Sequence, residues 1–198
     1  MIGFEPRPPI LAAAPENQEF AIAPLVLAFT ADPTVRWIYP DAHQFRIFFP
    51  QFVRAFGGKA FAQGTAYYLE GFHGTSLWLP PGVGPDEAAL VPLLEETVVS
   101  ARQAEVFALL EQMGSCHPAS SHWYLPLLGV DPRFQRCGFG AALLAPVLAA
   151  FDREQATAYL EATSPENIPF YERQGFAITA EIQAGSSPTL FAMVREPR

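Results

Sequence analysis

The sequence predicts an α/β protein with a mixed central β-sheet flanked by helices. Its 198 residues are enough for one domain with a sizeable core. Half of the residues are hydrophobic and 13% are aromatic, which excludes a disordered chain. A strand, a helix and a second strand follow one another in the C-terminal half, after a predicted hairpin. We therefore expect a single domain over residues 1–198.

The first third of the chain is predicted to be helical. A segment that opens at Pro15 carries apolar residues over most of one side as far as Phe29, which is typical of a buried helix. A second, amphipathic helix begins at Asp41 and carries phenylalanines at helical spacing until Gly57 and Gly58 end it.

The rest of the chain alternates strands with helices. The predicted elements are a hairpin over 65–69 and 76–79, helices at about 86–96 and 101–113, a strand over 122–130, a helix at about 138–153, a strand over 157–162, a helix at about 167–173, and closing strands around 176–183 and 189–194. The helix at 138–153 is a crossover of a length that favours two parallel strands joined by a right-handed connection.

Charge and hydropathy exclude several classes of partner. The formal net charge of -8 argues against a nucleic-acid-binding protein, which needs a basic face. The longest apolar run, 141–151, contains Pro146 and is much shorter than the roughly 20 residues of a membrane span. Because Pro6, Pro8 and Pro9 interrupt the N-terminal stretch, no secretory leader is predicted. We expect a cytoplasmic protein, either a monomer or a homodimer, without a membrane partner.

Cysteine and histidine show no metal-binding pattern. Cys116 and Cys137 are too few for a disulfide framework. His117 and His122 are five residues apart, which is not a usual ligand spacing, so ordinary packing and loop roles are expected and no metal.

A glycine loop lies between the strand at 122–130 and the next helix. Gly138 and Gly140 let the backbone turn tightly and let a bulky group approach the first amides of the helix. A helix N-terminus with free N–H groups is an anion site, and Gln135 and Arg136 can reach the same anion. The simplest alternative is that the glycines only allow a tight turn.

Two other phosphate-binding loops fit this stretch poorly. A Walker loop needs a Gly-Lys-Ser/Thr ending, which the stretch lacks. A dinucleotide-binding fingerprint needs a glycine or alanine where Leu143 stands, and further alternating units after it.

The motif Gln135-Arg136-Cys137-Gly138-Phe139-Gly140 resembles the coenzyme A pyrophosphate loop of GNAT-superfamily N-acetyltransferases. A second block, Asn167-Ile168-Pro169-Phe170-Tyr171-Glu172-Arg173-Gln174-Gly175-Phe176, stands where that superfamily keeps its catalytic tyrosine. The resemblance covers about the C-terminal 80 residues, from Leu128 onwards. It implies a GNAT-like acyl-CoA N-acyltransferase fold, with acceptor-side helices at about 10–60 and an acetyl-CoA-binding core at about 120–198.

The resemblance also implies roles for individual residues. Tyr171 is the expected proton donor to the departing thiolate, with a packed core tyrosine as the alternative. Glu161, at the end of a strand, is the leading candidate for the proton acceptor, although a structural hydrogen-bonding role fits it equally well. The residues expected to bind acetyl-CoA are Leu128, Gly129, Val130, Gln135, Arg136, Cys137, Gly138, Phe139, Gly140, Ala141, Asn167 and Tyr171.

Other candidates for the proton acceptor are His122, Glu70 and Asp32. Asp32, Trp37 and Tyr39 are candidates for binding the acceptor, because aromatic rings beside an acid can hold a cationic amine; the two aromatics could equally be core residues.

The implied activity is transfer of an acetyl group from acetyl-CoA to a primary amine of a small molecule or peptide, by direct attack in a ternary complex. The alternative is a non-catalytic acyl-CoA-binding or interaction module with the same fold, because no proton acceptor stands out in the sequence.

Overall fold

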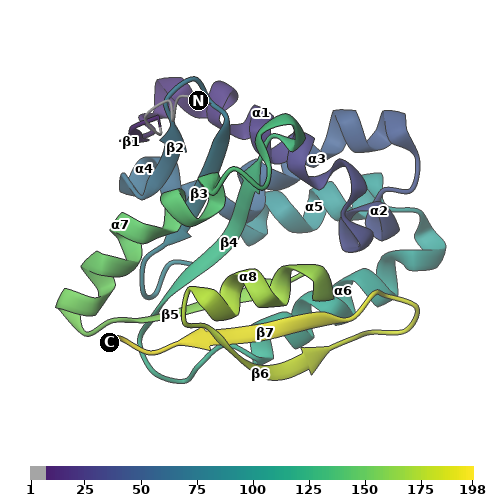
Figure 1. Ribbon diagram of the computed structural model, residues 1–198. Helices are drawn as coiled ribbons and strands as arrows, with labels where there is room; N and C mark the ends of the chain where they lie inside the picture. The colour runs from purple at the N-terminus through teal and green to yellow at the C-terminus, as the bar shows by residue number, and fades with distance from the viewer. Residues whose placement is uncertain (1–7) are drawn as a thin grey trace.

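Residues 8–198 are described by a computed structural model, which contains one mixed seven-stranded sheet (Figure 1). The strands are β1 (Ile10–Ala12), β2 (Ala66–Leu69), β3 (Gly74–Leu79), β4 (His122–Val130), β5 (Thr157–Ala162), β6 (Ala177–Ile182) and β7 (Leu190–Arg195). Their order across the sheet is β1-β2-β3-β4-β5-β7-β6. The mixed α/β class predicted from the sequence is confirmed. Pro6, used in the argument about the N-terminus, lies outside the described residues.

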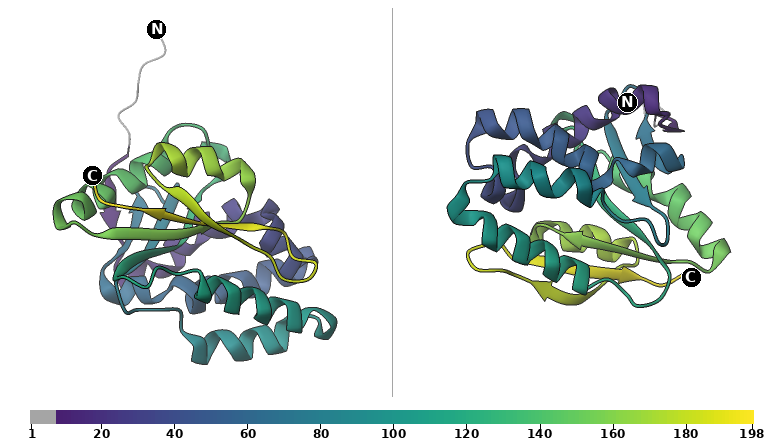
Figure 2. Two further views of the ribbon diagram at one scale, coloured as in Figure 1. Left: turned by 90° about the horizontal axis from the view of Figure 1, so that it is seen from below. Right: turned by 180° about the vertical axis from the view of Figure 1, so that it is seen from behind.

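Helices cover both faces of the sheet. They are α1 (Gln18–Ala28), α2 (Pro33–Ile38), α3 (Ala42–Gly57), α4 (Lys59–Gln63), α5 (Glu87–Thr97), α6 (Ser100–Ser115), α7 (Phe139–Glu154) and α8 (Ile168–Arg173). In the view from below, α7 and α8 lie on one side of the strands, and α5 and α6 lie on the other (Figure 2).

The two faces bury separate cores. On the α7 and α8 face, Trp78 and Phe151 pack edge to face beside Leu144 and Leu160. The opposite core is larger, and α3 contributes a column of phenylalanine rings whose successive centroids are 5.0, 5.9 and 5.1 Å apart. Those rings, Phe45, Phe49, Phe52 and Phe56, repeat every three or four residues, so the pattern places them on one helix face.

β4 and β5 pair for only part of their length. Their parallel pairing, predicted from the sequence, runs from His122 opposite Thr157 to Tyr124 opposite Tyr159 and then ends. Beyond it β4 pairs only with β3, and β5 only with β7. Pro126, which has no N–H to donate, stands two residues past the last pair, where the register of β3 against β4 also shifts. The two strands therefore open into a wedge at their C-terminal ends.

Most elements lie within a few residues of their predicted bounds, and β4 and β5 match them at both ends. Three short elements were not predicted: β1, α2 and α4. Each has six residues or fewer, which gives a periodic pattern too little length to be recognised. β1 is held at the sheet edge by its pairing with β2.

Candidate functional site

The backbone of β4 faces the wedge at alternate residues. The amide of Asp131 donates to the carbonyl of His73 at 2.9 Å, so Asp131 is directed toward β3. Because bonding direction alternates along a strand, Gly129 also faces β3, while Leu128 and Val130 face the wedge. The carbonyl of Val130 accepts a hydrogen bond from Nε2 of Gln135 at 3.1 Å, which closes one side of the wedge mouth.

Gly129 is required for packing on this strand. A Cβ atom there would lie 2.8 Å from Cβ of Ala28 and 3.2 Å from Cα of Leu25, both on α1. Since backbone atoms cannot move aside cheaply, any side chain at Gly129 would push α1 away from β4. Helix α1 is thus packed directly against the strand that lines the wedge.

The glycine loop ends at the wedge mouth. Arg136 and Gly138 both have left-handed backbone angles, with φ of 63° and 82°, and Gly138 is the N-cap of α7. No side chain caps α7, so its first amides remain directed outward. A Cβ atom on Gly140 would lie 3.2 Å from the ring of Phe170 on α8. The loop therefore presents a concave set of backbone N–H groups suited to an anion, beside a helix packed closely enough to exclude side chains.

Tyr171 lies on α8, half-buried between the rings of Phe170 and Phe176. Burial raises the pKa of its hydroxyl, and the nearby negative charge of Asp32 raises it further. Asp32 is the N-cap of α2, where one carboxylate oxygen accepts from the amides of Thr34 and Val35. Its other oxygen accepts a hydrogen bond from the hydroxyl of Thr163, just after β5. The structure thus brings the predicted residues Tyr171 and Asp32 to the same end of β5.

Glu161 lies on β5 with only 3% of its side chain exposed. Burial raises the pKa of its carboxyl to about 7, although the hydroxyls of Tyr124 and Tyr159 partly oppose the rise. Among the described residues, Oε1 of Glu161 has no hydrogen-bond partner; Nε2 of His117 faces it at 3.6 Å. A carboxyl group with this pKa can exchange a proton near neutral pH, as a general base must.

An apolar cavity of about 60 Å³ lies beside Glu161. Pro126 and Leu127 line it from β4, and Glu161 and Thr163 line it from β5 and the residue after it. Its other lining residues are almost all apolar and come from the helical face, except Leu190 on β7: Phe29, Thr34, Val35, Ile38, Phe49, Phe52, Phe56, Val106, Leu109, Leu110, Met113 and Leu190. The cavity therefore joins the wedge to the acceptor-side helices.

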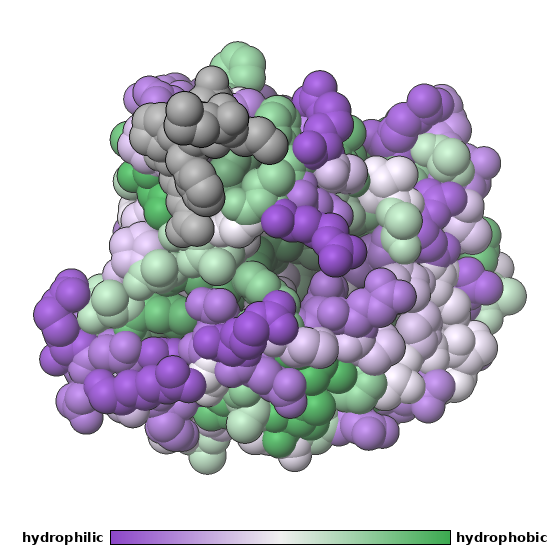
Figure 3. Space-filling model, in the orientation of Figure 1, coloured by the Kyte–Doolittle hydropathy of each residue, from purple (hydrophilic) through white to green (hydrophobic). Residues whose placement is uncertain are grey.

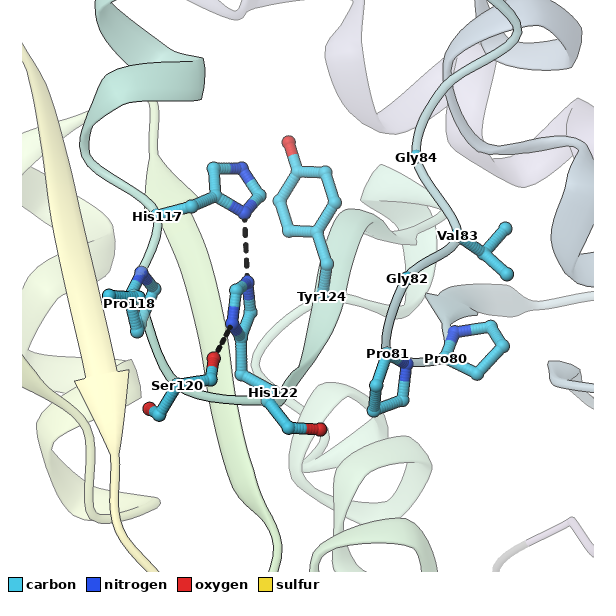
Figure 4. A pocket seen from close by; sticks show the side chains of 12 residues that line it. Pro80, Pro81, Gly82, Val83, Gly84, His117, Pro118, Ser120, His122 and Tyr124 are labelled. Carbon is cyan, nitrogen blue, oxygen red and sulfur yellow. Dashed lines mark hydrogen bonds between the residues drawn. The ribbon is translucent and has the colours of Figure 1, made fainter.

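A second pocket, of about 400 Å³, lies at the closed end of the wedge (Figure 4). Pro80 to Gly84 form one wall, and the loop from His117 to His122 forms the other. Nδ1 of His117 and Nε2 of His122 are 2.9 Å apart, and the ring of Tyr124 lies alongside. No pattern in the sequence links His117 to Glu161, because the two are brought together only by the packing of the loop after α6 against β5.

The remaining candidates are more dispersed. Tyr39 is 1% exposed, and its hydroxyl bonds to Thr97 on α5 at 3.0 Å. Trp37 donates to Ser186 at 3.1 Å and carries the guanidinium of Arg102 over its ring. These contacts are those of packed residues, so binding of an acceptor by Trp37 and Tyr39 stays a prediction. Asn167 is exposed before α8, and Cys137 is exposed in the loop.

Within residues 8–198, no cluster of three or more histidine, cysteine, aspartate or glutamate side chains is placed to hold a metal ion. Over the same residues, no helix has the length and apolar character needed to cross a membrane. On the face drawn in Figure 3, the surface is hollowed near its centre, where β4 and α8 lie in Figure 1.

Residues 88–176 match the model of the Acetyltransferase (GNAT) family. An uncharacterized N-acetyltransferase of Schizosaccharomyces pombe is 26% identical over 194 residues, covering 89% of this chain and 78% of the relative.

Solved structures agree with this match. A structure from Corynebacterium glutamicum, described as histone acetyltransferase HPA2 and related acetyltransferase, is 25% identical with a TM-score of 0.69 and 98% of each chain covered. The polyamine N-acetyltransferase of Drosophila melanogaster, at 14% identity, shares the fold with a TM-score of 0.63 over 95% of this chain and 99% of its own. Residues 88–176 thus resemble the GNAT acetyltransferase family, and the fold of the described chain resembles that of solved acetyltransferases.

Proposed function

We propose that this protein transfers an acetyl group from acetyl-CoA to a primary amine of a small molecule or peptide, by direct attack in a ternary complex. The observation that carries the proposal is the wedge between β4 and β5, which has an anion-binding loop at its mouth and a buried carboxyl group, Glu161, on one wall. The family supplies the donor, because GNAT acetyltransferases use acetyl-CoA.

The residues at the wedge fit coenzyme A. The uncapped amides at the start of α7, from Phe139 to Ala141, suit the pyrophosphate, and the exposed Arg136 adds a positive charge beside them. The backbone groups of Leu128 and Val130 would pair with the amides of the pantetheine arm, in the way a further strand would. When bound, acetyl-CoA supplies the activated acetyl group.

Three groups of this chain then take part in the reaction, each in a different step. The outward backbone of β4 holds the thioester carbonyl and polarises it. Glu161 removes a proton from the incoming amine, so that the nitrogen can attack the carbonyl carbon. Tyr171 donates its proton to the departing thiolate; its raised pKa means that the hydroxyl is still protonated when the thiolate forms.

The apolar cavity favours an acceptor that carries an apolar group next to its amine, because apolar side chains form most of its lining. In the Leu160-Glu161 strand end and the block from Asn167 to Arg173, the chain is similar to puromycin N-acetyltransferase. Puromycin is therefore one acceptor to test, together with simple alkylamines and arylalkylamines.

Calorimetric titration with acetyl-CoA tests the proposal first. We expect saturable binding, followed by release of free thiol when an amine from the panel is added. Absence of saturable binding at millimolar acetyl-CoA would contradict the proposal. Desulfo-coenzyme A serves as the control, since it should bind without releasing thiol.

The alternative is a non-catalytic acyl-CoA-binding module with this fold. The small volume of the apolar cavity favours it, because 60 Å³ leaves little room for an acceptor. Binding of acetyl-CoA without thiol release across the whole panel would support this alternative. Turnover that Tyr171→Phe abolishes would reject it.

A further inference from the structure

The proposed acetyl transfer releases one net proton from the acceptor amine in every turnover. An acceptor amine arrives mostly as an ammonium ion, since alkylamines have pKa values near 10. It loses two protons as its nitrogen–carbon bond forms and the carbon–sulfur bond breaks. One of them is balanced by the proton that the thiolate takes up. The other must leave the site in every turnover.

Glu161 has no direct way to pass that proton to solvent. Its side chain is 3% exposed, and the cavity on one side of it is lined mainly by apolar groups. On its other side stands His117, with Nε2 at 3.6 Å from Oε1, a separation that a small rotation of either side chain would close. The tyrosine rings of Tyr124 and Tyr159 flank the imidazole, at centroid distances of 4.7 and 4.3 Å.

The hydrogen bonds beyond His117 fix the protons of both imidazoles. Nδ1 of His122 lies 2.7 Å from the carbonyl oxygen of Ser120, which can only accept, so Nδ1 of His122 carries the hydrogen. In a neutral His122, Nε2 is then an acceptor, and it must receive the Nδ1 hydrogen of His117 at 2.9 Å. A neutral His117 therefore presents an unprotonated Nε2 to Glu161.

We propose that His117 and His122 relay the proton taken up by Glu161 to the 400 Å³ pocket at the closed end of the wedge. This proposal rests on the proposed function. The O–H bond of protonated Glu161 breaks as the Nε2–H bond of His117 forms, and the Nδ1 proton of His117 passes to Nε2 of His122. His122 then releases the Nε2 proton to water in the pocket and keeps the Nδ1 hydrogen that it donates to Ser120. Both rings line that pocket, so exchange with its water restores the starting tautomer of His117.

The electrostatics around His117 suit a relay that holds its proton only briefly. Burial, and to a smaller extent the neighbouring His122, lower the pKa of His117 to about 4, so the ring is neutral at pH 7. The titratable groups that face it are Glu161 and Tyr159 on β5, and His122 and Tyr124 on β4. Glu161 supplies the only carboxylate among them, which makes it the natural source of the proton.

The test measures turnover in His117→Gln and His122→Gln, with the amine of the panel that the parent acetylates fastest. We expect kcat at pH 7 to fall by about 10- to 100-fold in each variant, in the range for losing a proton-transfer group. KM for the amine and the dissociation constant of acetyl-CoA should stay within about twofold of the parent, because neither histidine lies at the glycine loop. His43→Gln, at an exposed histidine on α3, is the matched control and should leave kcat unchanged.

Chemical rescue separates a relay from a structural role. In His122→Gly, which removes the side chain that lines the pocket, added imidazole should restore at least a tenth of the parent kcat, whereas a lost packing contact would not be replaced. Parent-like kcat in both glutamine variants, or loss of kcat without rescue by imidazole, would overturn the relay. If the parent acetylates no amine of the panel, the proposed function fails, and the relay fails with it.

Discussion

At the scale of single residues, the buried position of Glu161 changes its pKa and so the pH dependence of stability. Burial holds the pKa of its carboxyl at about 7, against an ordinary value of 4.5. The folded protein thus binds the proton more tightly than the unfolded chain does. Stability is therefore highest below about pH 4.5 with respect to this group, and falls as the pH rises through 7. The cost of the buried charge above pH 7 is about 3 kcal/mol.

Glu161→Gln should accordingly stabilise the protein while it removes activity. We expect the melting temperature of the variant to exceed that of the parent at pH 8, with the difference vanishing near pH 4.5, because glutamine is neutral throughout. In the parent, kcat/KM should rise with pH through about 7 as Glu161 ionises. Melting curves and rates from pH 5 to 9 check both statements.

Glu96→Gln, at an exposed carboxylate on α5, is the control and should change neither property. A Glu161→Gln variant that keeps the parent's kcat would remove Glu161 from the mechanism.

Tyr171→Phe is expected to separate chemistry from binding. The loss of the hydroxyl should lower kcat by roughly 10²- to 10³-fold, the range for a general acid, and leave the affinity for acetyl-CoA nearly unchanged. Packing between Phe170 and Phe176 should survive, since only one oxygen is removed. Rates, titration and a melting curve on the same preparation measure all three effects.

Equal kcat values for parent and variant would count against this role, unless product release limits the parent. A burst of acetylated product in the first turnover would identify that case.

The sequence predicted the candidate catalytic residues but not the contacts that they make. Tyr171 and Glu161 could be chosen because one stands in a recognisable block and the other ends a strand. The side chains that surround them could not be predicted from the sequence. Asp32 approaches Tyr171, and His117 approaches Glu161, although more than 40 residues of chain separate the members of each pair. Trp37 and Tyr39 are candidates because they are aromatic and close to an acid in the sequence. That pattern is the same whether the rings pack inside the protein, as their hydrogen bonds indicate, or are free to bind an acceptor.

At the scale of elements, the glycine loop makes the clearest prediction. Gly138→Val should raise the dissociation constant of acetyl-CoA at least tenfold, equivalent to about 1.4 kcal/mol, because a branched side chain would block the pyrophosphate and disfavours a φ of 82°. Gly140→Val should have a similar effect by displacing Phe170. Arg136→Ala should weaken binding less. Calorimetric titration gives all three values.

Backbone strain alone could mimic this loss, and Gly64→Val controls for it. Gly64 has a φ of 68° and open space around its Cα, so it imposes similar strain far from the loop. If the loop variants fold and bind acetyl-CoA like Gly64→Val, the pyrophosphate does not lie at the start of α7.

The wedge is an element whose existence the sequence could not establish. The periodic patterns predicted β4 and β5 to the residue, and the length of α7 predicted that they run parallel. The point at which β4 and β5 separate depends on the strands on their outer sides. β3 pairs with β4, and β7 pairs with β5, beyond the point of separation. Pro126 is the one local signal, since a proline in a central strand cannot complete a ladder on both sides.

At the scale of the whole molecule, the proposed function assigns a donor side and an acceptor side to the structure around the wedge. α7 and α8 cover one face of the sheet, and the larger helical group covers the other, where it lines the apolar cavity together with residues of the sheet. The boundaries of about 10–60 and 120–198 for the two sides stay a prediction, because β1, at Ile10–Ala12, is already part of the common sheet. What joins the sides is the close contact of α1 with Gly129.

This division predicts where coenzyme A will protect the backbone. The amides of Leu128 and Val130 face the wedge without a partner strand, so in the free protein they should exchange with solvent faster than those of neighbouring β3. Saturating coenzyme A should slow their exchange at least tenfold, and that of Gly140 and Ala141 at the start of α7 as well. The amides of Tyr67 and Ser76, in the antiparallel hairpin, are the internal control and should slow only as much as global stability rises. Hydrogen exchange resolved to single amides measures this pattern; protection spread evenly over all strands would show that the ligand stabilises the fold without lying between β4 and β5.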